Sequence, residues 1–190
     1  MYALVLELLG ELTADAAYHG AHEQFLELIR AHFWKETYLW DSPDDASKRP
    51  NVFLAYLLQP ALLTDEQWKS CFSTIIHACS TEWGGLTSLD RAAASFQPLS
   101  TGENNLSYHN GDSWFFINNL AAVALARCDS HVYAQTINRL LLSSTEETLW
   151  KHFLGMPGEI ASAADGTSWG CGIQAFSAGT YLFLLQELGY

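Results

Sequence analysis

Basic residues are scarce in this chain. Nine of its 190 residues are lysine or arginine, against 21 aspartates and glutamates, and the formal net charge is −12. Surfaces that bind nucleic acid or anionic membranes need basic side chains to neutralise phosphates. The composition therefore argues against nucleic-acid and membrane partners. It remains compatible with a neutral or cationic partner, although solubility alone explains an acidic surface equally well.

Long apolar runs and paired cysteines are also lacking. No apolar run approaches the roughly 20 residues of a membrane-spanning helix, and the N-terminus has no basic region followed by a cleavage site. None of the four cysteines forms a CxxC pair, which disfavours a zinc or redox site and favours buried free thiols. We therefore expect a cytoplasmic protein without a metal ion or a cofactor. The cysteines are Cys71, Cys79, Cys128 and Cys171.

Aromatic residues, in contrast, are abundant. Seven tryptophans and eight tyrosines occur in a length that suits one domain spanning residues 1–190. Packing in a hydrophobic core explains most of them. The alternative is that some of these rings line a carbohydrate cleft.

Apolar residues recur at helical spacing along most of the chain. In the first predicted helix, Val5, Leu8, Leu9 and Leu12 share one face. A second helix is predicted from about residue 16 to 33, a short one over 52–58, and others over 115–126 and 173–188. The one strand expected is a short stretch within 37–40.

Two segments have the pattern of a capping box, in which a hydroxyl and a side chain three residues later close the first turn of a helix. Thr64 and Gln67 are predicted to begin a helix that carries an apolar stripe. The segment 144–147 is predicted to begin a short helix through residue 153. Helices in antiparallel pairs, joined by long polar loops, predict an all-α protein and favour a toroid of helical hairpins over a four-helix bundle. The stripe comprises Trp68, Cys71, Phe72, Ile75, Ile76 and Cys79.

The segment 108–114 concentrates polar and aromatic groups directly before a predicted helix. It reads Tyr-His-Asn-Gly-Asp-Ser-Trp, and Asn104 and Asn105 precede it in the same loop. Aromatic faces can stack on pyranose rings, while carboxylates and amides bind hydroxyls. Asp112 also suits the N-cap of the following helix, and His109 suits a hydrogen-bonding loop residue.

Glycoside hydrolysis needs two carboxyl groups, which stand roughly 6.5–9.5 Å apart in an inverting enzyme. Glu159 is the best candidate for one of them, since it lies in an apolar, turn-rich segment and is poorly explained as a solvated surface residue, and Asp112 is the second candidate. The alternative is an ordinary loop or capping glutamate. Arg49, before Pro50, either pairs with a nearby aspartate or donates to a sugar hydroxyl.

Four segments resemble, in the same order, the C-terminal amylo-α-1,6-glucosidase domain of glycogen debranching enzymes. The second segment is long and specific, and the other three are short. They are Arg-Pro-Asn at 49–51, the segment 108–114 with the following Phe-Ile-Asn-Asn-Leu, Gly-Glu-Ile-Ala-Ser-Ala at 158–163, and Gly-Cys with Gln-Ala-Phe-Ser within 170–177.

The resemblance implies a partial (α/α)6 toroid with about the C-terminal seven of twelve helices. It also implies inverting hydrolysis of α-1,6-linked glucose on glycogen or a limit dextrin. Glu159 falls at the position of the general base, and Phe176 stands where family members commonly have Trp. The residues implied to line or support the sugar pocket are Arg49, Asn51, Tyr108, His109, Asn110, Asp112, Trp114 and Gln174.

One feature of the family is missing. Its general acid is an aspartate in a Thr-Trp-Met-Asp segment upstream of the Arg-Pro-Asn motif, and this sequence has no such segment. The simplest interpretation is a C-terminal fragment that is inactive alone and associates with an N-terminal half or with itself. The alternatives are a non-catalytic glucan-binding remnant and another (α/α)6 glycosidase, resembling glucoamylase or trehalase.

Overall fold

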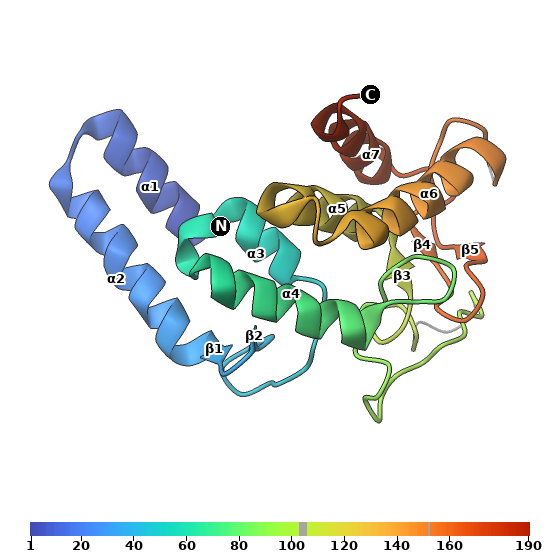
Figure 1. The fold of residues 1–190 in the computed structure, drawn as a ribbon, viewed down its shortest axis with the longest axis horizontal. Helices are drawn as coiled ribbons and strands as arrows, with labels where there is room; N and C mark the ends of the chain where they lie inside the picture. The colour runs from blue at the N-terminus through green and yellow to red at the C-terminus, as the bar shows by residue number, and fades with distance from the viewer. Residues whose placement is uncertain (103–105, 152) are drawn as a thin grey trace.

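The computed structural model describes residues 1–102, 106–151 and 153–190 (Figure 1). Asn104 and Asn105 lie outside the described residues. The fold is mostly helical, and no described helix is long and apolar enough to cross a membrane. The helices are α1 (Tyr2–Thr13), α2 (Ala16–Phe33), α3 (Val52–Leu58), the 3-10 turn η1 (Pro60–Leu62), α4 (Asp65–Cys79), α5 (Phe115–Asp129), α6 (Ala134–Trp150) and α7 (Ala175–Leu188).

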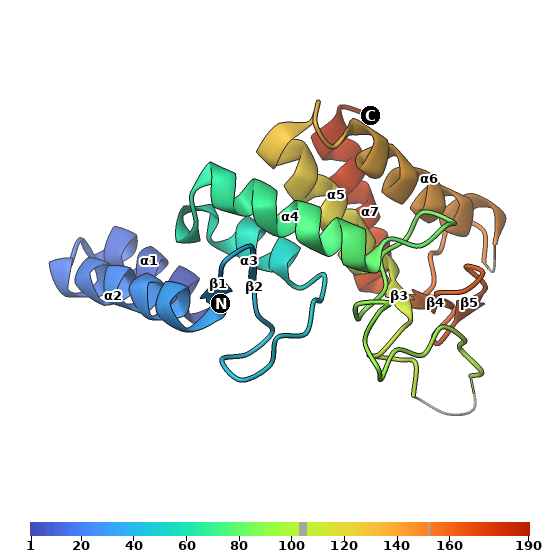
Figure 2. The same ribbon diagram turned by 60° about the horizontal axis from the view of Figure 1, so that its bottom comes forward.

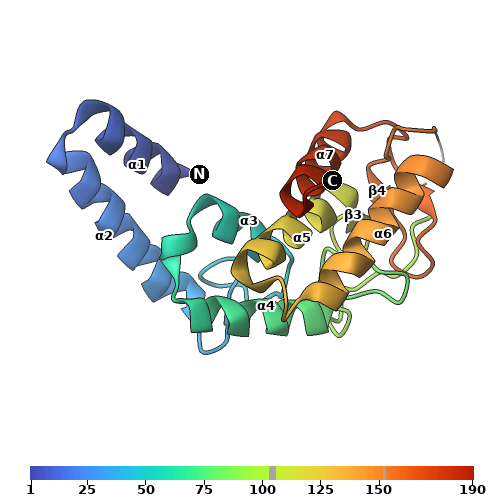
Figure 3. The same cartoon turned by 45° about the horizontal axis from the view of Figure 1, so that its top comes forward.

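The helices follow one another along an open curve. The α1–α2 hairpin stands at one end, α3 and α4 lie in the middle, and α5, α6 and α7 form the other end (Figures 1 and 3). The long connections after α2, α4 and α6 project to the same side (Figure 2). The polar loops of the sequence therefore gather on one side of the helical scaffold.

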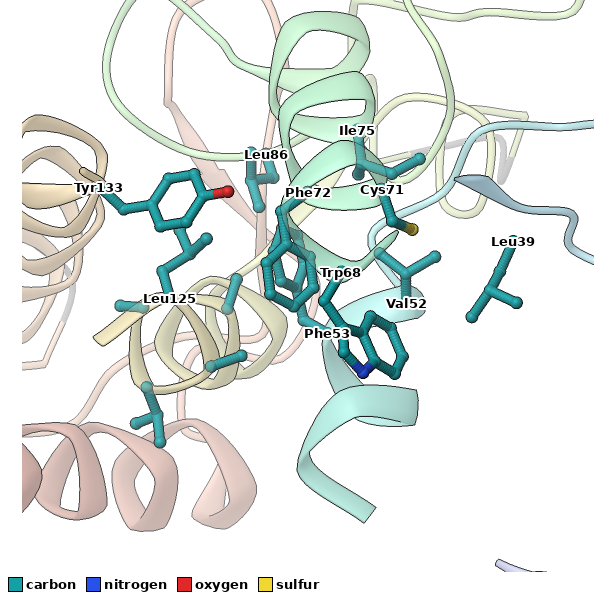
Figure 4. Packing of buried hydrophobic residues seen from close by; sticks show 14 of the residues in the cluster. Leu39, Val52, Phe53, Trp68, Cys71, Phe72, Ile75, Leu86, Leu125 and Tyr133 are labelled. Atoms are coloured by element: carbon teal, nitrogen blue, oxygen red, sulfur yellow. The ribbon is translucent and has the colours of Figure 1, made fainter. Parts of the chain in front are cut away.

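The main core lies around α4. Phe72 has no exposed surface, and its ring stacks on Phe53 at 4.9 Å and on Trp68 at 5.6 Å (Figure 4). Thr64 Oγ1 accepts a hydrogen bond from the backbone N–H of Gln67, while the Gln67 side-chain oxygen accepts one from the backbone N–H of Thr64. This confirms the capping box and the predicted stripe, of which Ile76 alone is only partly buried.

The apolar residues that share one face of α1 are largely exposed. Val5, Leu8 and Leu12 are 43%, 46% and 82% exposed, whereas Ala3, Leu6 and Gly10 are buried. The reason is the close approach of α2: a Cβ at Gly10 would stand 2.8 Å from the His19 ring. Gly10 admits α2, whereas Val5, Leu8 and Leu12 lie on the exposed side of α1.

The second predicted capping box is wrong, because α6 runs through residues 144–147 without a break. The Thr145 hydroxyl donates to the Leu141 carbonyl and the Thr148 hydroxyl to the Ser144 carbonyl. These hydroxyls bond to the preceding turn of the helix, as Ser and Thr do within helices, instead of capping a new one.

Two small antiparallel sheets lie in the connections between the helices. β1 (Trp34–Lys35) pairs with β2 (Tyr38–Leu39), close to the strand expected within 37–40. The other sheet was not expected from the sequence. It has the order β3-β4-β5, formed by Ser113–Trp114, Ile160–Ala161 and Ser168–Trp169.

Candidate functional site

The second sheet brings together the two segments that the sequence singled out. Ser113 pairs with Ala161 and Trp114 with Ile160. The Phe115 amide continues the ladder by donating to the carbonyl of Glu159 at 3.3 Å. The aromatic segment and the predicted base are therefore side by side, although they are far apart in the sequence.

Glu159 is half-buried and held at both carboxylate oxygens. The Tyr108 hydroxyl donates to Oε1 at 2.5 Å, and the Cys171 amide donates to Oε2 at 2.9 Å. The Glu159 amide in turn donates to the Cys171 carbonyl at 2.9 Å. Each carboxylate oxygen has two lone pairs, so Glu159 can still accept a proton from a bound water.

Tyr108 acts as a donor in this pair. Burial and the hydrogen bond to Glu159 raise the pKa of the Tyr108 hydroxyl to about 12. The phenol therefore keeps its proton throughout the physiological range. A neutral phenol can donate to Glu159 without adding a negative charge beside it.

The aromatic side chains near Tyr108 form a continuous wall. The Trp114 ring lies 4.6 Å from the Tyr108 ring and stacks on the His109 ring at 5.5 Å. The Trp114 indole donates to the Tyr108 carbonyl at 3.0 Å. Phe116 contacts Trp114 at 5.9 Å and Phe176 at 5.0 Å, so Phe176 completes the wall from α7.

Arg49 joins three segments of the chain. Its Nε pairs with Asp41 at 3.1 Å, and its Nη1 donates to the carbonyls of Ser88 at 2.9 Å and His109 at 2.6 Å. The Asn51 amide donates to Asp41 at 3.2 Å. The expected pairing of Arg49 with an aspartate is thus confirmed. Asp41 holds the side chains of both Arg49 and Asn51.

Several of these residues line a pocket of about 270 Å³, but its lining does not include Asp41, Tyr108, Glu159 or Phe176. A second cavity of about 350 Å³ shares Arg49 and Asn51 with it but is mostly apolar and extends toward α2. Among the described residues, no group of three or more His, Cys, Asp or Glu side chains could hold a metal ion. The first pocket is lined by Arg49, Pro50, Asn51, Leu54, Ser88, His109, Trp114, Phe116 and Ile117.

Asp112 does not cap the following helix, so that prediction is wrong. α5 begins at Phe115 with Trp114 as its N-cap, and Trp114 makes no side-chain cap. Asp112 is instead 1% exposed and accepts from the Ser107 hydroxyl at 3.0 Å. Burial raises the pKa of its carboxyl group, against the opposing effect of hydrogen bonds from Ser107 and Ser100. The β3 pairing occupies the position where the capping turn was expected.

Two other predicted residues lie away from the pocket lining. The Asn110 side chain donates to the Leu106 carbonyl at 3.2 Å and closes a local turn. Gln174 precedes α7, and its backbone N–H donates to the Pro157 carbonyl at 3.1 Å. The binding roles of all the predicted site residues, and the catalytic role of Glu159, stay predictions.

Sequence reasoning did not single out Asp41 or Glu147 as parts of the site. Asp41 had a weak signal, since it precedes Arg49 in a loop with two other aspartates. Glu147 had a misleading one, since its hydroxyl-rich neighbours matched a capping box. Its fully buried carboxylate instead accepts hydrogen bonds from the segment around Glu159.

Comparison with known proteins identifies the family and the fold of the chain. No curated protein matches the chain, but 33 chains of solved structures do. One is the neutral trehalase Nth1 from Saccharomyces cerevisiae, with a TM-score of 0.67 and 17% identity over 98% of this chain and 36% of that chain. At this identity the likeness shows a shared fold. A family profile described as amylo-alpha-1,6-glucosidase matches residues 11–182. The chain therefore belongs to the amylo-alpha-1,6-glucosidase family.

Proposed function

We propose that this chain forms one wall of a glycosidase pocket that removes α-1,6-linked glucose from a glycogen-type glucan with inversion. The placement of Glu159 is the observation that supports this best. Its carboxylate is held by Tyr108 and Cys171, and its neighbour Ile160 pairs with Trp114, which lines the pocket.

In this proposal Glu159 is the general base. One carboxylate oxygen takes a proton from water as that water attacks the anomeric carbon. Tyr108 and the Cys171 amide each occupy one lone-pair direction and fix the orientation of the others. Trp114 supplies a stacking face for a glucose ring, and Asn51 and His109 bind its hydroxyls.

The general acid comes from outside the chain. Neither Glu159, which adjoins the pocket through the Ile160–Trp114 pair, nor any other Asp or Glu is among its described lining residues, and the sequence has no Thr-Trp-Met-Asp segment. The trehalase chain, which nearly all of this chain matches, is much longer. These facts support a toroid arc that is completed by a further helical segment, which carries the acid.

The ends of the arc suit such a completion. α1 exposes Val5, Leu8 and Leu12 at one end, and α7 exposes Leu182 (65%) and Phe183 (37%) at the other. Apolar helix faces of this kind are buried against neighbouring helices in a closed ring. Without that partner, we expect the same faces to promote self-association.

The lack of an acidic pocket residue also favours a second candidate, a non-catalytic glucan-binding domain. In that case the aromatic wall and Arg49 would serve binding alone. The two candidates differ in whether hydrolysis appears once the missing carboxylate is supplied.

The binding part is tested by electrophoresis in native gels that contain glycogen. The wild-type chain is expected to migrate more slowly with glycogen, and Trp114→Ala is expected to remove this retardation. Trp150→Ala is the matched control, because Trp150 is 78% exposed and lies outside the pocket lining. Equal loss in both variants would argue against binding in this pocket.

The catalytic part is tested by glucose release from limit dextrin, isomaltose and trehalose. The chain alone is expected to release none. A helical segment with the Thr-Trp-Met-Asp sequence, supplied in trans, is expected to restore release from limit dextrin, and Glu159→Gln to abolish it. Retardation without any hydrolysis would favour the binding domain, and release from trehalose alone would favour a trehalase-like enzyme.

A further inference from the structure

Glu147 on α6 has no exposed surface. Its helix contributes no residue to the pocket lining. Burying a carboxylate is unfavourable unless hydrogen bonds compensate for the lost water. The donors to Glu147 therefore indicate what its burial achieves.

Both donors belong to the hairpin that carries Glu159. The Gly158 amide donates to Glu147 Oε1 at 3.2 Å, and Gly158 directly precedes Glu159. The Ser168 hydroxyl donates to Glu147 Oε2, and Ser168 pairs with Ala161 in the β4–β5 ladder. A single carboxylate thus accepts hydrogen bonds from both arms of the hairpin, from the segment just before β4 and from β5.

The tip of the hairpin is held separately. Lys151, which directly follows the end of α6, donates to the Gly166 carbonyl at 3.3 Å. The Trp83 indole donates to the Ala163 carbonyl at 3.1 Å from the opposite loop. These contacts act several residues from Glu159, whereas Glu147 acts on the residue next to it.

We propose that Glu147 is a positioning residue for Glu159, a role that rests on the proposed function of Glu159 as general base. Glu147 fixes the backbone on which Glu159 stands, so that the Glu159 carboxylate meets Tyr108 and the Cys171 amide. Because hydrogen bonds to a charged acceptor are stronger than neutral ones, the buried carboxylate holds this backbone more firmly than a neutral acceptor of the same shape.

Four substitutions separate the contributions. Glu147→Ala removes both hydrogen bonds. Glu147→Gln keeps the shape: its amide oxygen can accept from Gly158, and its amide nitrogen can donate to the Ser168 hydroxyl. Leu140→Ala is the matched control on the same helix, because Leu140 is buried in the core and away from the hairpin. Ser168→Ala removes a single hydrogen bond and serves if Glu147→Ala does not fold.

The measurement is amide hydrogen exchange at Cys171, whose N–H donates to the Glu159 carboxylate, relative to Phe72 in the core of α4. Glu147→Ala is expected to raise this ratio roughly tenfold or more, the effect of losing a hydrogen bond to a charged group. Glu147→Gln is expected to restore most of the protection. Leu140→Ala is expected to lower the stability without raising this ratio, because it acts on global unfolding.

An unchanged ratio in Glu147→Ala, or equal ratios in the Ala and Gln variants, would overturn the positioning role. This outcome is independent of the activity of the protein. If the wild-type chain shows no glycogen retardation, the proposed function fails, yet the exchange ratio still decides whether Glu147 holds Glu159. If retardation and a raised ratio both occur, Glu147→Ala is also expected to weaken glycogen retardation more than Leu140→Ala does.

Discussion

Replacing Gly111 by alanine tests the packing of the aromatic segment directly. A Cβ at this position would overlap the Gln97 carbonyl oxygen and stand 2.7 Å from the Gln97 carbonyl carbon. Both are backbone atoms, so no side-chain rotation can relieve the overlap. Glycine is needed here because two segments of backbone approach each other closely.

The expected destabilisation can be worked out from these contacts. Overpacking costs about 1–3 kcal/mol. Displacement also threatens two hydrogen bonds, from the Gly111 amide to Ser88 Oγ at 3.0 Å and from the Gln97 amide to the Asn110 carbonyl at 2.8 Å, each worth about 1 kcal/mol. The total is roughly 3–5 kcal/mol, which corresponds to a fall in Tm of about 6–20 °C for a chain of this size.

The assay is urea unfolding followed by tryptophan fluorescence, with two further glycines as controls. Gly20 in α2 and Gly179 in α7 have no described atom within 4 Å of an added Cβ. Their alanine variants should gain about 0.5–1 kcal/mol, because alanine favours the helix over glycine. If Gly111→Ala unfolded at the wild-type midpoint, or if all three variants shifted in the same direction, the argument from close packing would be refuted.

Three more predictions concern charge, thiols and association. Burial raises the pKa of Asp112 above its unfolded value of about 3.9, so its contribution favours folding at lower pH and is lost as pH rises through the raised value. Asp112→Asn should remove this part of the slope of unfolding free energy against pH, and an unchanged slope would contradict it. Burial raises the pKa of Cys71 and Cys79 to about 12. A thiol reagent at pH 8 should therefore label the exposed Cys171 first and label Cys71 and Cys79 only after unfolding, which peptide mass spectrometry can check. The exposed faces of α1 and α7 should cause self-association in size-exclusion chromatography, and a stable monomer with little dye binding would contradict this.

The helices that pack on the main core were the most predictable part of the fold. The cap at Thr64 and the stripe along α4 agree with the structure because local hydrogen bonds and the core favour the same helix. α1 was harder, since it has apolar residues on several faces and the sequence does not say which one meets α2. Its buried face is set by Gly10 and its contact with His19.

The site was predictable in its components but not in its assembly. The segments around Trp114 and Glu159 could be selected by residue type and resemblance. Their pairing could not, because two-residue strands leave too short an alternation to recognise. Glu147 was hidden for a related reason: the partners of a buried carboxylate come from tertiary structure, while its sequence neighbours indicated a cap.

The β3–β4–β5 sheet has a consequence for how the protein folds. Ser113 and Ala161 can pair only after α5 and α6, which lie between them in the chain, have been arranged. Closing such a long loop lowers the chain entropy before the contacts compensate for it, and contacts distant in sequence slow folding. We therefore expect the site to form late in refolding, after most of the helical signal has returned. In mild denaturant, the Glu159 geometry should correspondingly be lost before the α4 core unfolds.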